Sequence, residues 1–196
     1  MGYRPLPILK VFILALDISP SLTDAWTIMA INTGLVTTLF VLVITSLATG
    51  YGFGVKAQQL PFSAEIGFSE QQFSFLRWWV KLALVIGVLL PIALCIQAWG
   101  QPASLMFWGS YLVVVAIQLI SERVFSQWLV SSVVVPIGFG YTAFRLWQLL
   151  DGFTQLSLSG LPLLGFVSVV LFWIANLVML MTIAIPTVYQ GQRLQE

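Results

Sequence analysis

Apolar residues in this chain form long runs separated by short polar segments. Five of these runs have approximately the length that a transmembrane helix needs, which is about 20 residues. They cover approximately residues 25–48, 80–99, 105–121, 126–150 and 162–185. The pattern predicts an all-α fold, a polytopic integral membrane helical bundle with five transmembrane helices in a single domain over residues 1–196.

A sixth apolar segment, residues 5–16, is shorter than a membrane span and contains Lys10. Segments of this length insert partly or lie in the membrane interface. We therefore predict a short N-terminal hydrophobic helix that is either interfacial or partly spanning.

The adjacent charges Glu122 and Arg123 interrupt the apolar sequence between residues 105 and 150. Charges are costly inside the hydrocarbon core, so this dipeptide favours a turn at a membrane surface between the third and fourth runs. The alternative is a charged functional group within the bilayer. The turn is our working interpretation. It would place Glu122 and Arg145 near opposite membrane surfaces, about 30 Å or more apart at about 1.5 Å per helical residue.

Two segments have the pattern of a helix N-terminus. Ser21 lies three residues before Asp24, and Ser69 lies three residues before Gln72, a spacing that suits reciprocal capping. Residues 55–68 are the longest non-apolar part of the chain, and residues 50–75 are predicted to form a cytoplasmic loop. This loop is the best candidate for contact with a soluble partner.

The predicted loop begins with the sequence G-Y-G-F-G. A dinucleotide fingerprint needs G-x-G-x-x-G between a strand and a helix, and this segment has neither the spacing nor the context. It predicts a flexible exit from the first transmembrane helix.

Small residues recur every four positions in three of the runs, so each set shares one helix face. Such faces allow neighbouring helices to approach closely. The three sets are Ala30, Gly34 and Thr38; Ala83, Gly87, Pro91 and Cys95; and Ser132, Pro136 and Gly140.

Composition supports a membrane protein and narrows its partners. The chain is 59% hydrophobic and 8% charged, with a mean hydropathy of +0.99, whereas soluble domains carry about a quarter charged residues. The net charge of +1 argues against a nucleic-acid partner, because no basic stripe could neutralise phosphates. The expected partners are the lipid bilayer and other membrane proteins, or further copies of the chain.

The distribution of basic residues predicts the orientation. If residues 5–16 cross the membrane, seven of the eight Lys and Arg residues lie on one side, and that side should be cytoplasmic. If residues 5–16 lie on the surface, the distribution is five against three. We expect both termini to be cytoplasmic. The composition, rich in glutamine and without histidine, suggests a bacterial inner (plasma) or thylakoid membrane.

Catalytic chemistry has little basis in this sequence. Histidine is absent, which removes a frequent metal ligand, the usual haem ligand and the commonest general base. The spans also lack the two acids of an aspartyl mechanism. We expect no enzyme activity, no metal and no cofactor.

Six polar residues are candidate functional groups. Gln118 and Glu122 are four residues apart and face the same way, so Glu122 could accept a proton or cation, or could pair with a nearby base such as Arg123. Arg145 could bind an anion or lipid headgroup, or pair with Asp151. The other two candidates are amides in the apolar runs, which serve either as hydrogen bonds between helices or as contacts along a transport path: Asn32 and Asn176.

Two functional classes remain. The first is an accessory, assembly or scaffold component that binds other membrane proteins. The alternative is a small oligomeric transporter or channel that uses Glu122 and Arg145. The scarcity of polar groups within the runs and the lack of an inverted repeat favour the first class.

Overall fold

The computed structural model describes residues 22–156 and 158–193, and these residues are helical except for short turns and one loop. The structure separates into two units, residues 1–38 and residues 39–196, which are treated individually below. In chain order the elements are α2 (Leu22–Lys56), α3 (Glu70–Leu84), η1 (Val85–Leu89), α4 (Leu90–Gln97), α5 (Pro102–Trp128), η2 (Ser131–Val133), α6 (Val134–Gln155), α7 (Gly160–Met179), η3 (Leu180–Ala184) and α8 (Ile185–Arg193). The prediction of an all-α helical bundle is confirmed.

Five helical segments of the described residues are long and apolar enough to cross a membrane. Their bounds are Thr33–Lys56, Glu70–Gln97, Pro102–Trp128, Ser131–Thr154 and Gly160–Tyr189. Each contains or overlaps one predicted run and extends it at one or both ends. The predicted segment at residues 5–16 and the predicted cap at Ser21 lie outside the described residues.

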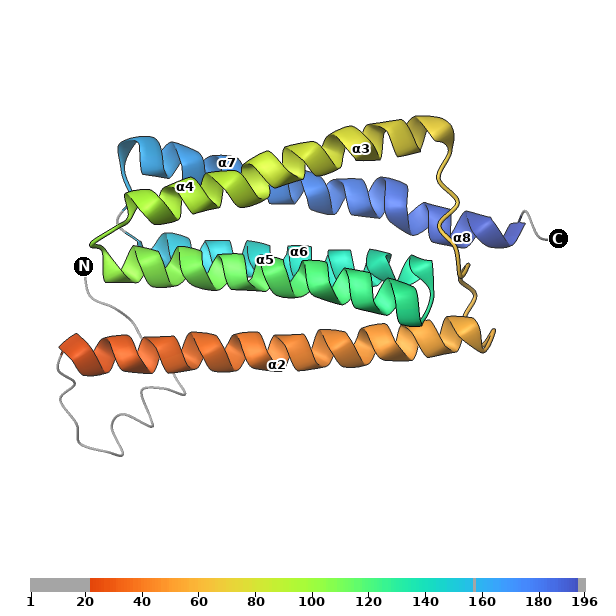
Figure 1. The fold of residues 1–196 in the computed structure, drawn as a ribbon, viewed down its shortest axis with the longest axis horizontal. Coiled ribbons are helices and arrows are strands. Elements are labelled where there is room, and N and C mark those ends of the chain that lie inside the picture. The colour runs from red at the N-terminus through yellow and green to blue at the C-terminus, as the bar shows by residue number, and fades with distance from the viewer. Residues whose placement is uncertain (1–21, 157, 194–196) are drawn as a thin grey trace. The chain divides into compact units, whose positions relative to one another are not determined.

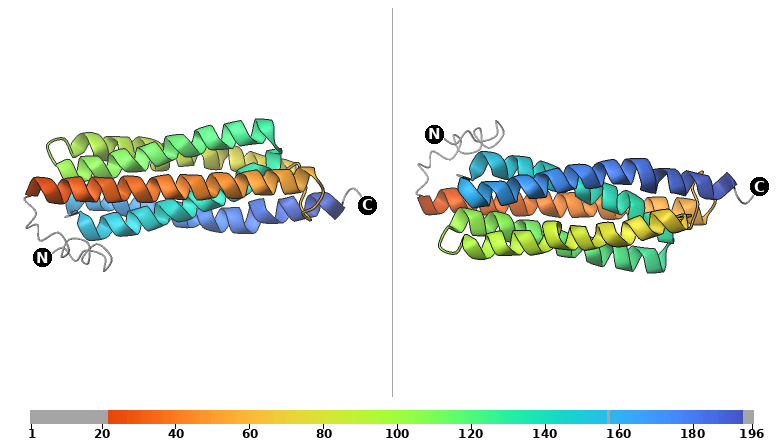
Figure 2. Two further views of the ribbon diagram at one scale, coloured as in Figure 1. Left: turned by 90° about the horizontal axis from the view of Figure 1, so that it is seen from below. Right: turned by 90° about the horizontal axis from the view of Figure 1, so that it is seen from above.

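Within the second unit, consecutive spanning segments run antiparallel (Figure 1). One end of this unit holds the loop 57–69, the turn between α5 and α6, and the end of α8, while the other end holds the turn 98–101, the end of α6 and the start of α7. Figure 2 shows the same helices from two further directions. Of the five spanning segments, Ser131–Thr154 is the most buried, so α6 is the central helix.

The predicted surface turn at Glu122–Arg123 is wrong. Helix α5 continues without interruption to Trp128, and the chain reverses at residues 129–130 instead. The charge pattern misled because Glu122 accepts a hydrogen bond from Gln118 one turn earlier on the same helix, and Gln118 links it to Arg145 on α6, so the carboxylate is accommodated without a turn.

The predicted flexible exit at residues 50–54 is also wrong, since α2 continues to Lys56. Two of its glycines bring other side chains close to the helix. A Cβ on Gly52 would lie 2.5 Å from Leu129 Cδ1, and a Cβ on Gly54 would lie 2.7 Å from Leu60 Cδ1. These glycines serve packing rather than flexibility.

The loop 57–69 is fixed to the bundle by its backbone. Ser63 N donates to Val188 O at 3.0 Å, and Ser132 N donates to Ala64 O at 3.1 Å. The Ser131 hydroxyl donates to the same Ala64 carbonyl at 3.0 Å. This loop therefore closes one end of the bundle, and its role in contact with a soluble partner remains a prediction.

The predicted cap at the start of α3 is confirmed. The Gln72 backbone N–H donates to the Ser69 hydroxyl, and the Gln72 side chain accepts from the Ser69 backbone N–H. This reciprocal pair satisfies two amides that a helix start otherwise leaves without partners.

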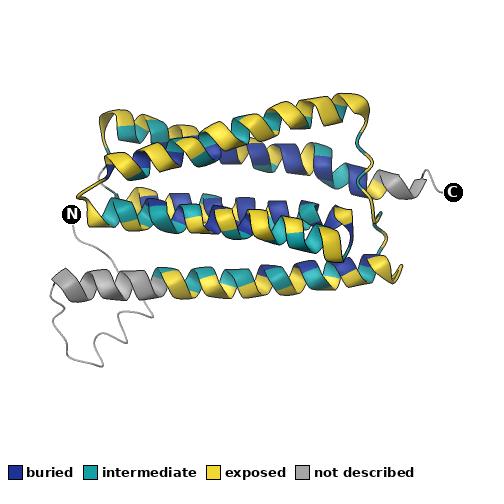
Figure 3. Cartoon of the chain, in the orientation of Figure 1, coloured by how far each residue is buried: buried dark blue, intermediate teal, exposed yellow. Residues whose placement is uncertain are grey.

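Aromatic side chains fill much of the interior, and buried positions concentrate on the helix faces that point inward (Figure 3). The larger apolar cluster comprises Leu94, Trp108, Tyr111, Val115, Leu149, Phe166, Val169, Phe172 and Trp173. The smaller one comprises Val135, Met179, Leu180, Ala184 and Val188.

The small-residue faces of α3–α4 and α6 contact other parts of the same bundle. A Cβ on Gly87 would lie 2.9 Å from Trp173 Cζ2, and one on Gly140 would lie 2.3 Å from Ile44 Cδ1. Both faces thus serve close approach of helices, as their spacing indicated.

Candidate functional site: a buried polar network and a lateral groove

Arg145 is the most buried charged residue among those that the structure describes, with only 2% of its surface exposed. Its Nη2 donates a hydrogen bond to Gln118 Oε1, and its guanidinium carbon lies 4.1 Å above the centre of the Trp173 ring. The ring face attracts the cation electrostatically, and this attraction is stronger away from water. Within the described residues, Arg145 Nε has no hydrogen-bond partner.

Gln118 connects this arginine to a carboxylate. Its Nε2 donates to Glu122 Oε1 while its Oε1 accepts from Arg145. The two α5 residues lie on one helix face because they are four positions apart. Glu122 also faces α6, since a Cβ on Gly138 would lie 3.7 Å from Glu122 Oε1.

The expectation that Glu122 and Arg145 are far apart near opposite surfaces is wrong. Because α5 continues past Glu122 and α6 returns antiparallel to it, Gln118 comes next to Arg145 and bridges the two charged groups. The sequence spacing suggested a long separation only because it assumed a turn at Glu122.

Tyr111 forms a second branch of the polar network. Trp173 Nε1 donates to the Tyr111 hydroxyl at 2.6 Å, and that hydroxyl donates to the Gly87 carbonyl at 2.9 Å. Gly87 lies in the π-helical turn η1, four residues before Pro91, which has no N–H to complete the helical bond. Tyr111 therefore supplies the donor that the proline cannot.

Asn176 connects three helices. Its side-chain N–H donates to the Thr142 hydroxyl at 3.0 Å, and its oxygen accepts from Trp79 Nε1 at 2.8 Å.

Gln148 lies on the same side of α6 as Arg145. Its Nε2 donates to the Ser110 hydroxyl at 3.0 Å. The oxygen of Gln148 is buried and has no partner among the described residues.

The structure thus brings together four of the six predicted site residues, in two hydrogen-bonded groups on α5, α6 and α7. Gln118, Glu122 and Arg145 form one group, and Asn176 belongs to the other. Arg123 is exposed near the end of α5. Asn32 lies on α2 in the first unit, and its side chain is outside the described part.

Sequence reasoning missed several members of the network, although a usable signal was present. Thr142 and Gln148 were missed, although they lie three residues before and three residues after the predicted Arg145 on α6, so that all three share one face and are buried. The other missed members are Trp79, Ser110, Tyr111 and Trp173. Their aromatic or small side chains do not stand out in an apolar run.

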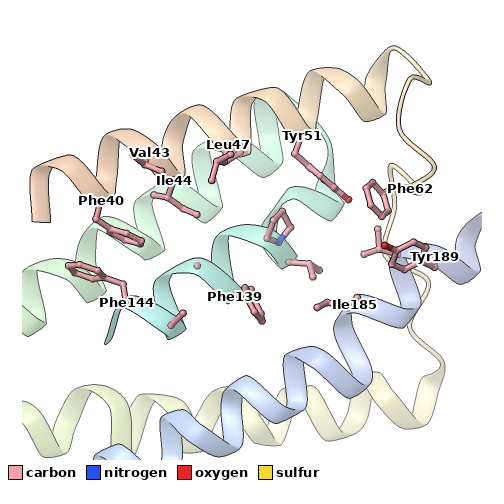
Figure 4. A pocket seen from close by; sticks show the side chains of 16 residues that line it. Phe40, Val43, Ile44, Leu47, Tyr51, Phe62, Phe139, Phe144, Ile185 and Tyr189 are labelled. Atoms are coloured by element: carbon pink, nitrogen blue, oxygen red, sulfur yellow. The ribbon is translucent and has the colours of Figure 1, made fainter. Parts of the chain in front are cut away.

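An apolar groove of about 690 Å³ lies apart from this network, between α2, α6 and α8 (Figure 4). Among the residues labelled in Figure 4, Phe40 and Phe144 lie at one end of the groove, and Tyr51, Phe62 and Tyr189 lie at the other end. The remaining lining residues are Val43, Ile44, Leu47, Ala48, Val135, Pro136, Phe139, Gly140, Ala143, Ile185 and Val188.

Chemically, the network offers one carboxylate and one guanidinium bridged by an amide. Such a group could hold a proton, or an anion at the arginine, but each hydrogen bond named above also joins neighbouring helices or turns of one helix. In the part of the chain that the structure describes, no three His, Cys, Asp or Glu side chains are grouped to hold a metal ion.

Comparisons of the chain with protein-family models, with curated proteins and with solved structures found no match.

Proposed function

We propose that this protein is a non-catalytic integral membrane component that binds other membrane proteins, as an accessory, assembly or scaffold subunit. The observation that carries this proposal is that the interior polar groups are bonded mainly to one another. Arg145 is held by Gln118 and Trp173, and Asn176 is held by Thr142 and Trp79. Polar groups used in this way hold helices together.

The exterior of the second unit is the surface left for interaction. Its helices present large apolar side chains that are more than half exposed in this chain alone. They include Leu42, Leu47, Trp78, Val80, Ile96, Val113, Leu119, Leu171 and Val178. In a membrane these side chains contact either lipid or neighbouring helices, so a partner helix could bind without any change to the interior.

Affinity purification of the full chain from its native membrane in mild detergent, followed by quantitative mass spectrometry, tests the proposal. We expect one or a few membrane proteins in fixed stoichiometry with the chain. The Glu122→Gln variant should retain the same partners, because Glu122 faces the interior of the bundle. A homogeneous homo-oligomer without other proteins would contradict the proposal.

A second candidate is a small oligomeric transporter or channel, and the bridge between Glu122 and Arg145 favours it. Ionisable residues at membrane depth are rare and frequently mark ion or proton paths. Under this candidate the reconstituted protein should carry a proton or cation flux in liposomes. Glu122→Gln should abolish that flux, and the matched change Glu65→Gln in the exposed loop should not.

The absence of flux in wild-type liposomes, together with a stoichiometric partner complex, would reject the transporter and support the accessory role.

The cellular location of the protein is part of the same proposal. We propose a bacterial plasma or thylakoid membrane with the loop 57–69 and the C-terminal end of α8 on the cytoplasmic side, because basic residues concentrate at that end.

A further inference from the structure

The groove between α2, α6 and α8 has the dimensions of a site for a single hydrocarbon chain. Phe40 and Tyr51 mark its two ends on α2, and eleven residues of helix correspond to about 16 Å at about 1.5 Å per residue. One leaflet of the hydrocarbon core is about 15 Å deep, half of the roughly 30 Å total. The groove therefore matches the depth of one leaflet.

The groove has a volume of about 690 Å³ and an almost entirely apolar lining. A single flexible hydrocarbon chain fits this space and this chemistry.

The chemistry of the groove differs between its ends. The end formed by Phe40 and Phe144 consists of two stacked rings with centroids 4.0 Å apart. At the other end are the phenol rings of Tyr51 and Tyr189, and the Tyr51 hydroxyl donates to Ser132 Oγ at 3.3 Å. Tyrosines prefer the level of the membrane interface, where an apolar body meets a polar surface.

A basic residue lies beyond the tyrosine end. Lys56 is in the last turn of α2, five positions after Tyr51, and is exposed. Five positions correspond to about 140° around an α-helix, so Lys56 lies on a different face of α2 from Tyr51 and does not line the groove. Along the groove itself, the order of stacked rings, aliphatic walls and tyrosines follows the order of tail and ester in a phospholipid.

We propose that this groove binds one acyl chain of a glycerophospholipid, with the chain terminus near Phe40 and Phe144 and the ester region near Tyr51 and Tyr189. The groove opens outward, since Val43, Leu47 and Tyr189 on its lining are more than half exposed. A lipid could therefore enter sideways from the bilayer. This inference is independent of the accessory role.

Ala143 provides a direct way to fill the groove. It lines the groove and is exposed, so Ala143→Phe adds a ring to the space without displacing a buried contact. Ala175 on α7 is also an exposed helical alanine and does not line the groove. Ala175→Phe is the matched control.

The test uses the full chain in nanodiscs that contain phosphatidylglycerol with a photoreactive diazirine midway along one acyl chain. After irradiation, mass spectrometry locates the labelled peptides. We expect labels concentrated on residues 40–51 and 135–144, several-fold above other lipid-facing segments. Ala143→Phe should reduce them several-fold, and Ala175→Phe should leave them unchanged.

Three outcomes would overturn the proposal. Even labelling of all exposed helices would mean contact with surrounding lipid only. Undiminished labelling of the groove in Ala143→Phe would mean that the probe lies outside it. Loss of labelling in the presence of an isoprenoid or of a helical peptide would assign the groove to that other ligand. Because the wild-type label map requires no variant, the test does not depend on the folding of Ala143→Phe.

Discussion

The single hydroxyl group of Tyr111 joins two other buried residues through hydrogen bonds. It donates to the Gly87 carbonyl, to which Pro91 has no N–H to offer, and it accepts from Trp173 Nε1. Both partners are buried, so removal of the hydroxyl takes one hydrogen bond from a buried carbonyl and one from a buried N–H. We expect Tyr111→Phe to lower the free energy of unfolding by about 1–3 kcal/mol, the cost of buried polar groups that lose a hydrogen bond.

A matched change at a second tyrosine separates this effect from the loss of any phenol. Tyr141 is as buried as Tyr111, but its hydroxyl lies 3.5 Å from Ser121 Oγ, a weak contact. Tyr141→Phe should therefore cost less. Reversible unfolding in mixed micelles would measure both variants, and equal losses would contradict the role assigned to Tyr111.

Residue identity explains why the candidate site was only partly predictable. The amide and carboxylate of Gln118 and Glu122 were recognised from their spacing, and so were the chemical roles open to Arg145. Their connection was not predictable, because it depends on where the chain reverses after α5. A charged pair in an apolar run is compatible with a surface turn or with buried partners, and only the neighbouring helix decides between them.

At the scale of the helix, the apolar runs predicted which segments span but not where each helix ends. Apolar length is set by the bilayer, whereas helix ends depend on local packing. The glycines of residues 50–54 illustrate this, since they continue α2 and accommodate Leu60 and Leu129. The Ser69 cap was predictable because all of its chemistry lies within four residues.

Gly152 is a similar case on α6, where it lies inside the helix. A Cβ at Gly152 would lie 2.1 Å from Phe107 Cε2 and 2.5 Å from Phe107 Cζ. We expect Gly152→Ala to destabilise the α5–α6 pair by about 1–3 kcal/mol, because an aromatic ring cannot move aside as easily as a flexible chain end. Thermal unfolding in detergent would measure the change.

Gly109 on α5 is the matched control for this substitution. It has no heavy atom within 4 Å of a Cβ position among the described residues. Gly109→Ala should leave stability unchanged or raise it by up to about 1 kcal/mol, through helix propensity. A stabilising effect at Gly152 would show that Phe107 and α6 are not packed as described.

At the scale of the whole chain, the distribution of charge predicts the orientation. Lys56, Arg77, Arg123 and Arg193 lie in the halves of their spanning segments, or just beyond them, that are nearer the loop 57–69, and Lys81 lies close to the middle of the segment Glu70–Gln97. The sixth described basic residue, Arg145, is buried and belongs to neither surface. Among the described residues the opposite end therefore has no basic side chain, which strengthens the prediction that the loop end is cytoplasmic.

Single cysteines introduced into a Cys95→Ala background would test this orientation in intact cells with a membrane-impermeant maleimide. Gln59→Cys in the loop should react only after permeabilisation, and Gln101→Cys in the opposite turn should react in intact cells, because both positions are exposed. The reverse pattern would contradict the charge argument.

A third position, Gly2→Cys, tests the N-terminal segment. With five spans, the start of α2 lies on the same side of the membrane as Gln101. If both termini are cytoplasmic, residues 5–16 must also cross the membrane, and Gly2→Cys should then be protected in intact cells. Reaction of Gly2→Cys in intact cells would mean that residues 5–16 do not cross.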